Sequence, residues 1–587
     1  MSYIACATGE DRRPVLPPTS GVPLVRTSAS AASWTLSVDG VGGRAEDLAQ
    51  HLWHHPDGAF GYAGIIYNWP ELTRRLRAVV DARTEITSCA HAIALLLRHD
   101  PQWTLANVNG KFAAVDVTAH TITCWRDKIG EEQLYHGGGP RRFVAASTVL
   151  SVAESLGTAR IVVPDSFRVF ETPVGAETML EGVSKLPPGS VLTRDAAEGR
   201  VTTRTYWQVE PGETTESDED VVAGFRDLLF DAITLRMDGG ANSCFLSGGQ
   251  DSSFVAGALA RLGSPPRFAF TTAFAELDHV YNEAPYAALA AKHSGAEHVV
   301  LEPNASDFAT HYPKTIEVLG EVKANAAHFI EYWIARAAAE RGITRLFSGY
   351  GADESLGGEV RYLVGYLDRD RATAMRLAQE HPLLRDYRPL FEKIATVPQD
   401  ADEALKYFTL MKRGDASGGD GPHLALVRSL FAAAGDRLVD QMGIVDTAIS
   451  GQPLLDTARV DKYWGVDKIC PFLDHRVITA AYALPERLKI RDLTTKVALR
   501  LASAGIVPDE ITHRPTKVGF AFPHNHGPYQ RFLSDLADRF AVRTGRPVRV
   551  DPSRGRYDRT LLMAASEEIL RRRVEDVPVG VRTGEGG

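Results

Sequence analysis

The chain has 587 residues, more than one hydrophobic core usually accommodates, so about two to four domains are expected. Its 44% hydrophobic and 24% charged residues are typical of a globular protein, and a net charge of -9 gives no general attraction to nucleic acid. No apolar run is long enough to span a bilayer, and charges near the amino terminus interrupt any signal-peptide core. We therefore expect a cytoplasmic protein with neither nucleic acid nor membrane as a partner.

The 5 cysteines lie far apart and form no CxxC pair. An odd, dispersed set of this kind is typical of reduced thiols. It argues against a disulfide framework and against a zinc site.

Short β-like runs dominate the amino-terminal part of the chain, at 64–67, 112–115 and 142–146. Turn-forming segments such as Asn109-Gly110 and Gly137-Gly138-Gly139 separate them. The pattern predicts a layered, mostly β domain of the α+β class over residues 1–210. The acidic segment 211–220 lacks periodic apolar residues and is interpreted as a linker, with a helix starting at residue 221.

Strands and helices alternate in the domain predicted over residues 221–587. Strand-like segments at 268–272 and 297–301 enclose a helical stretch around 284–292. This alternation predicts an α/β domain with a doubly wound parallel sheet, whose ligands bind at the carboxyl ends of the strands. Residues beyond about 360 have mainly helical patterns.

The most informative segment is Ser247-Gly248-Gly249-Gln250-Asp251-Ser252-Ser253, which follows the apolar strand-like residues 244–246 and precedes a helical pattern. Its glycines let backbone N–H groups approach an anion, and its serine hydroxyls and the helix start add further donors. Asp251 is suited to hold Mg²⁺ on phosphate oxygens. The segment therefore predicts a pyrophosphate cradle and the cleavage of ATP between its α and β phosphates. The alternative is an ordinary strand–helix turn.

A second glycine turn, Ser348-Gly349-Tyr350-Gly351-Ala352-Asp353-Glu354, follows the apolar pair Leu346-Phe347. Asp353 is the second candidate Mg²⁺ ligand, because one carboxylate from each turn would clamp one metal-bound pyrophosphate. The alternative is that Asp353 merely caps a helix.

Two lysines are candidates for contacts with phosphate and with an activated acyl group. Lys496 begins the segment 496–500, and Lys517 lies between turn residues and the apolar segment 518–520. An ammonium group suits phosphates and the charge that develops on an acyl-adenylate. The alternative for each is a solvated surface charge.

These segments, with Cys470-Pro471-Phe472-Leu473-Asp474, resemble in their order the asparagine synthetase-like family of ATP pyrophosphatases. The resemblance covers nearly the whole chain. It implies an amino-terminal class II glutamine amidotransferase-like (Ntn-hydrolase-like) domain and a carboxyl-terminal domain that adenylates a carboxylate with ATP and Mg²⁺. By family position, Leu246 and Gly349 line the adenosine pocket. The landmarks in the amino-terminal half are 64–72, 109–113, 126–130 and 186–189.

The amino-terminal half departs from the family at its glutamine site. The family's nucleophile is a cysteine exposed when the first methionine is removed, and here Ser2 holds that position. The family's Asn-Gly is Ala63-Gly64, no RGPD segment is found, and Cys6 lacks an adjacent α-amine to act as its base. We expect the domain to persist as a scaffold without glutaminase activity. The alternative is that Ser2 replaces the cysteine, as in N-terminal serine hydrolases.

The loss of an ammonia source implies that the amine comes from the substrate itself, as in two branches of the family, the β-lactam synthetases and the lasso peptide cyclases (macrolactam synthetases). Tyr350 is similar to the catalytic tyrosine of β-lactam synthetases, where asparagine synthetases usually carry Glu. Lys517 corresponds to their catalytic lysine and Lys496 to their phosphate-facing lysine.

A helical addition around 368–430 and a tail beyond His524 favour a peptide substrate, and hence a lasso peptide cyclase. The resemblance then implies a precursor peptide, a leader-binding protein and a leader peptidase as partners. A β-lactam synthetase or another small-molecule amide synthetase is the alternative. A glutamine-dependent asparagine synthetase and a non-catalytic scaffold are less favoured.

Overall fold

A computed structural model describes most of the chain, as residues 2–8, 24–31, 34–41, 45–81, 83–158, 160–274, 282–381, 384–412, 420–451, 456–514, 522–550 and 558–576. Within these ranges, no helix combines the length and apolar character needed to cross a bilayer.

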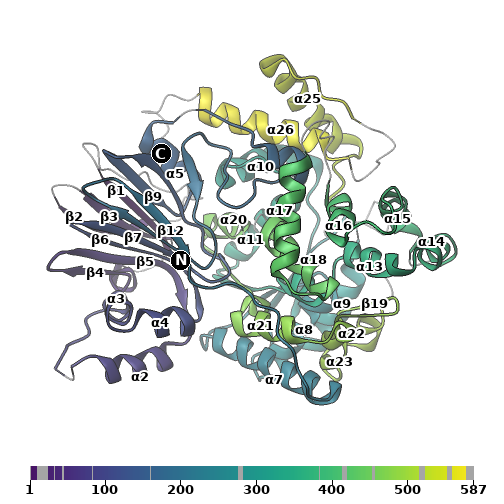
Figure 1. Ribbon diagram of the computed structural model, residues 1–587, viewed down its shortest axis with the longest axis horizontal. Coiled ribbons are helices and arrows are strands. Elements are labelled where there is room, and N and C mark those ends of the chain that lie inside the picture. Colours follow the sequence, from purple (N-terminus) through teal and green to yellow (C-terminus); the bar gives the residue numbers. More distant parts are fainter. Residues whose placement is uncertain are drawn as a thin grey trace.

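Two stacked antiparallel sheets form the amino-terminal domain (Figure 1). Their strands are β1 (Ser2–Thr8), β2 (Leu24–Ala31), β3 (Trp34–Val41), β4 (Leu52–His55), β5 (Gly58–Ile66), β6 (Gly110–Thr118), β7 (Thr121–Arg126), β8 (Tyr135–Gly139), β9 (Arg142–Ala146), β10 (Val183–Lys185), β11 (Ser190–Asp195) and β12 (Val201–Thr205). The first sheet has the order β10-β8-β9-β1-β3-β2 and the second β12-β11-β7-β6-β5-β4. Alternate side chains from both sheets, among them Ile4, Leu36 and Val115, meet in a buried core.

Helices cover the outer faces of both sheets. The second sheet is covered by α2 (Trp69–Val79), α3 (Cys89–His99) and α4 (Pro101–Asn107). The first sheet is covered by α5 (Val149–Leu156), whose Val149 and Leu150 join a core shared with the carboxyl-terminal domain. The amino-terminal domain is therefore a four-layer sandwich packed against its neighbour.

The glycine triplet 137–139, expected to be a turn, lies within strand β8 instead. A Cβ atom on Gly137 would lie 2.4 Å from the carbonyl oxygen of Gly182, so the glycine permits close approach of two chain segments. The chain reverses just afterwards, at Pro140-Arg141.

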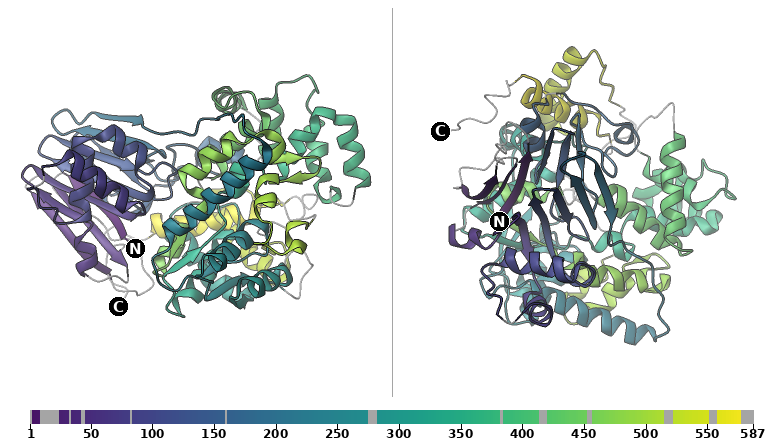
Figure 2. Two further views of the ribbon diagram at one scale, coloured as in Figure 1. Left: turned by 90° about the horizontal axis from the view of Figure 1, so that it is seen from below. Right: turned by 60° about the vertical axis from the view of Figure 1, so that its left-hand side comes forward.

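The carboxyl-terminal domain contains a five-stranded parallel sheet in the order β15-β14-β13-β16-β17 (Figures 1 and 2). Its strands are β13 (Cys244–Phe245), β14 (Phe268–Thr272), β15 (Glu297–Leu301), β16 (Arg345–Phe347) and β17 (Asp467–Ile469). Helices that pack around it include α7 (Asp218–Arg236), α8 (Gln250–Arg261), α9 (Ala284–Ser294), α10 (Ala305–Leu319) and α11 (Ala327–Ala339). The doubly wound α/β architecture expected from the alternating pattern is confirmed.

Helix α7 begins at Asp218, three residues before the expected helix start at residue 221. The Ser217 side chain accepts a hydrogen bond from the Asp220 N–H, and three acidic residues occupy the first turn. The cap and the helix dipole together draw 218–220 into the helix.

A helical addition with its own core follows the second glycine turn. It contains α13 (Val360–Leu367), α14 (Arg371–Glu380), α15 (Arg388–Ile394), α16 (Glu403–Met411), α17 (Asp420–Ala433) and α18 (Leu438–Asp446). Near the carboxyl terminus, α25 (Gly527–Thr544) and α26 (Thr560–Arg571) pack together against α10.

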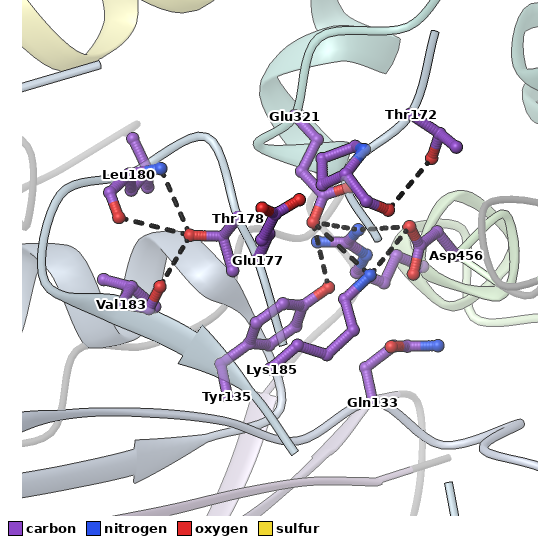
Figure 3. A network of polar contacts seen from close by, with 12 residues as sticks. Gln133, Tyr135, Thr172, Glu177, Thr178, Leu180, Val183, Lys185, Glu321 and Asp456 are labelled. Atoms are coloured by element: carbon purple, nitrogen blue, oxygen red, sulfur yellow. Dashed lines mark hydrogen bonds and ion pairs between the residues drawn. The ribbon is translucent and has the colours of Figure 1, made fainter. Parts of the chain in front are cut away.

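Buried ion pairs join the two domains. The Lys462 ammonium, on α20 (Ala458–Tyr463), lies 2.5 Å from both carboxylate oxygens of Glu132. In Figure 3 the Lys185 side chain of β10 reaches the carboxylates of Glu321 and Asp456, at 3.9 and 3.5 Å. Because such pairs need defined geometry to offset their desolvation, they fix the orientation of the domains.

We expect Lys462→Met to lower the free energy of unfolding by about 3–5 kcal/mol, because it leaves the Glu132 carboxylate buried without its counter-ion. Urea denaturation measures the change. Arg160→Met is the control, since its partner Glu181 is exposed and the loss should stay below about 1 kcal/mol. Equal losses in the two variants would contradict the role given to the buried pair.

Candidate functional site

The two glycine turns lie together because their strands are neighbours. Strands β13 and β16 run parallel, with Cys244 opposite Phe347, so both turns leave the same edge of the sheet. The turns touch, since a Cβ atom on Gly349 would lie 2.7 Å from the Ser252 backbone nitrogen. A side chain at position 349 would therefore separate the two halves of the site.

The first turn presents hydroxyl and backbone N–H groups at the start of a helix. The Ser252 hydroxyl lies 3.2 Å from the Ser247 nitrogen and 3.1 Å from the Ser247 hydroxyl. Gly248 has a φ of 73°, and Gly249 occupies the N-cap of α8. No side chain of the described residues caps this helix, so its first N–H groups remain suited to bind an anion.

Lys496 joins the carboxylates of both turns. Its ammonium nitrogen lies 2.6 and 2.7 Å from the two Asp251 oxygens and 2.5 Å from an Asp353 oxygen. Lys496 is buried and adopts a left-handed backbone conformation, with φ 55°, at the start of α23 (Val497–Ala502). Strain of this kind in a non-glycine residue is typical of functional sites.

The donor set fits Mg²⁺ bound together with a nucleotide. Two carboxylates and one ammonium leave a net charge of −1 between the turns, which favours a divalent cation. Among the described residues, no group of three or more His, Cys, Asp or Glu side chains is placed to hold a metal by itself. An ion held by Asp251 and Asp353 would take its other ligands from phosphate oxygens and water.

A cavity of about 630 Å³ adjoins the turns. Its lining includes six of the predicted site residues: Ser247, Asp251, Ser252, Gly349, Tyr350 and Asp353. At its other end it reaches the helical addition, where Val360, Leu363 and Tyr387 line it. The volume is within the range of small-molecule sites.

The other predicted residues lie around this cavity or outside the described chain. Leu246 packs into the core behind the first turn, and its carbonyl accepts a hydrogen bond of 2.6 Å from the Thr271 hydroxyl. Ser253 is buried in α8. Lys517 belongs to the undescribed segment 515–521, so its place in the site stays a prediction.

Tyr350 belongs to a polar cluster that the sequence analysis missed. Its hydroxyl donates to Glu331, and that carboxylate also contacts the Lys468 ammonium, which lies 4.8 Å from the centre of the Tyr350 ring and 3.1 Å from Asp461. Burial, and then the Glu331 carboxylate, raise the pKa of Tyr350 well above 10, so the phenol is protonated at neutral pH. The available signal was Glu331 itself, a single acid within the apolar run 329–334.

The amino terminus does not present a reactive thiol among the described residues. Ser2 is 2% exposed, and its hydroxyl accepts a hydrogen bond of 2.9 Å from the Gly64 N–H. Cys6 is fully buried, and burial raises the pKa of its thiol to about 12. Neither side chain combines nucleophile and access in the way glutamine hydrolysis requires.

Comparisons with known proteins agree with this two-part organisation. Residues 224–574 match the family model described as asparagine synthase, and residues 49–207 match that of a glutamine amidotransferase domain.

Three curated relatives show the range of similarity. A putative glutamine-hydrolysing asparagine synthetase of Mycobacterium tuberculosis is 27% identical over 522 residues, covering 81% of this chain and 77% of the relative. The glutamine-hydrolysing asparagine synthetase 1 of Bacillus subtilis is 25% identical over 490 residues, covering 79% and 76%. A carboxyethyl-arginine beta-lactam-synthase of Streptomyces clavuligerus is 27% identical over 338 residues, covering 55% and 61%.

We expect Gly349→Ala to weaken the binding of MgATP by about 5- to 150-fold, because overpacking between the turns costs about 1–3 kcal/mol. Isothermal titration calorimetry measures this. Gly224→Ala is the matched control, since a Cβ atom there meets no neighbour within 4 Å on the exposed side of α7. Unchanged affinity in Gly349→Ala would show that close contact between the two turns is not needed to bind MgATP.

Proposed function

Because the chain belongs to the asparagine synthase family of ATP-dependent amide-forming ligases, we propose that it forms an amide within a single substrate molecule. The substrate in this proposal is a precursor peptide, which is closed into the macrolactam ring of a lasso peptide. The amine is the peptide's own amino-terminal group, and the carboxylate is the side chain of an Asp or Glu residue.

The observation that carries the proposal is the Tyr350 hydroxyl bound to Glu331 at the cavity that adjoins Asp251 and Asp353. A phenol paired with a carboxylate is suited to take a proton from an attacking amine and to pass its own proton to the partner. Ser2 and buried Cys6 support the same proposal, because they leave the amino-terminal domain without an evident means to release ammonia.

In the first step the substrate carboxylate attacks the α phosphate of ATP, which gives an acyl-adenylate and releases pyrophosphate. Ser247, Ser252 and the backbone of Gly248 and Gly249 would bind the pyrophosphate, while Leu246 and Gly349 would flank the adenosine. Mg²⁺, held by Asp251 and Asp353, would neutralise phosphate charge when bound.

In the second step the amine attacks the activated carbonyl, the new C–N bond forms, and AMP leaves. Tyr350 would accept the amine proton as its own proton passes to Glu331. Lys496 would stay with the phosphates, and Lys517 would stabilise the oxyanion. Binding both ends of one peptide in contact supplies the proximity that a flexible chain lacks.

The cavity supports a peptide because it continues from the turns to the apolar side chains of Val360 and Leu363 in the helical addition. The β-lactam synthase relative supports the second candidate, intramolecular closure of a small amino acid derivative. A precursor peptide as substrate further implies a leader-binding protein and a leader peptidase as partners.

Mass spectrometry tests the proposal. The protein is incubated with ATP, Mg²⁺ and the precursor peptide encoded beside its gene, with any encoded leader-binding protein and peptidase. We expect the core peptide to lose one water while AMP and pyrophosphate form. If the peptide loses no water under these conditions, the peptide substrate is wrong and a small-molecule substrate is favoured. Incorporation of ¹⁵N from labelled glutamine would contradict an internal amine.

We expect Tyr350→Phe to slow amide formation by about 10²–10⁴-fold, because it removes the hydroxyl that exchanges protons with the amine. Lys517→Ala should abolish product formation, because it removes the ammonium group that would stabilise the oxyanion. Both variants should retain ATP–pyrophosphate exchange. Quenched-flow measurement separates the two steps. Wild-type turnover in either variant removes that residue from the mechanism.

A further inference from the structure

A second, much smaller cavity lies beside Tyr350. Its volume is about 20 Å³, and Tyr350 lines both cavities. Residues of both domains form its walls: Lys111 and Glu131 from the amino-terminal domain, with Tyr350, Thr457, Ala458, Lys468 and Cys470 from the carboxyl-terminal domain. The space matches one water molecule, and its lining offers that water several polar partners.

Glu131 has no direct partner in this arrangement. It is 8% exposed, and within the described chain its carboxylate forms no hydrogen bond or ion pair. A buried carboxyl group that forms no direct hydrogen bond is costly, so its polar interactions run through the cavity it lines. The charged and titratable groups that act on it are Asp127, Arg236, Lys111, Glu132, Tyr67 and Cys470, and Lys468 and Tyr350 line the same cavity.

Lys111 connects the same domain to the strand that carries Lys468. Its ammonium, on β6, lies 3.0 Å from an Asp467 carboxylate oxygen and donates a hydrogen bond of 2.8 Å to the Lys468 carbonyl. The Lys468 ammonium in turn contacts Glu331, the acceptor of the Tyr350 hydroxyl. A continuous set of contacts therefore runs from the amino-terminal sandwich to Tyr350.

We propose that Lys111 and Glu131 are positioning residues of the synthetase site, supplied by the amino-terminal domain and acting on Tyr350 through the small cavity and Lys468. The domain that lacks a glutaminase nucleophile thus completes the site of its neighbour. The consequence for amide formation rests on the proposed function, whereas the coupling of Glu131 to Tyr350 does not.

The coupling has a defined sign. Burial, and then the Asp127 carboxylate, raise the pKa of Glu131 to about 8. As the pH rises through this value, a negative charge forms across the cavity from Tyr350. That charge makes the pair of Tyr350 and Glu331 a stronger proton acceptor, so the amide-forming step accelerates over this pH range.

Fluorine NMR tests the coupling without any substrate. Tyr350 is replaced by 3-fluorotyrosine, and its ¹⁹F resonance is followed from about pH 6 to 9.5. We expect a titration step near pH 8 in the parent protein, which Glu131→Gln should lose and Glu131→Asp should recover. A separate step near pH 7 from Asp461, which also acts on Tyr350, should be present in every variant. Lys111→Met should shift the midpoint of the Glu131 step upward, because it removes a cation that favours ionised Glu131.

Glu154→Gln is the matched control, because Glu154 forms another interdomain ion pair, 2.6 Å from Arg573, and does not line the cavity. It should titrate like the parent protein. A resonance that lacks the step near pH 8 in the parent protein, or that keeps it in Glu131→Gln, overturns the proposal.

The kinetic consequence separates this proposal from the proposed function. With the precursor peptide, Glu131→Gln should slow amide formation by about tenfold above pH 8 and flatten its pH profile, with unchanged ATP–pyrophosphate exchange. If the ¹⁹F resonance titrates but no peptide product forms, the coupling of Glu131 to Tyr350 stands and the proposal of a peptide substrate is wrong. Product formation by Glu131→Gln with the parent pH profile overturns the positioning role alone.

Discussion

The adjacency of strands β13 and β16 in a parallel sheet is the constraint on which the rest of the site depends. It brings two glycine turns, about a hundred residues apart in the chain, to one edge, where Asp251 and Asp353 share the ammonium of Lys496. Parallel strands place their carboxyl ends together, so the position of the site follows from the order of the strands. Glycine at 349 is then required because the turns are in contact.

Charge is distributed unevenly around this edge. On the substrate side, two carboxylates and one ammonium are suited to a divalent cation and phosphates. Behind Tyr350, the pairs of Lys468 with Glu331 and Lys111 with Asp467 keep a buried polar region in defined geometry. Buried ions are tolerated only with such partners. Tyr350 lies between this paired region and the cavity at the glycine turns, and it belongs to both.

The amino-terminal domain has a structural role beside its likeness to a glutamine amidotransferase domain. Its lysines and glutamates form the interdomain pairs that fix the sandwich against the synthetase domain, through Lys462 and Glu132 and through the cluster in Figure 3. Loss of the nucleophilic cysteine leaves these contacts untouched. These contacts give a physical reason for the chain to retain the amino-terminal domain, whichever source supplies the amine.

The sequence by itself determined the doubly wound sheet, the β-rich first domain and both glycine turns, because these depend on local periodicity and on residues that permit special backbone geometry. Only the tertiary structure decided which charged side chains lie next to Tyr350. Glu331 and Lys468 lie 137 residues apart, and Glu131 comes from another domain, so no local pattern links them. The glycines 137–139 show the same limit. Their local sequence is typical of a turn, but in the fold they belong to strand β8, where Gly137 lies close to Gly182.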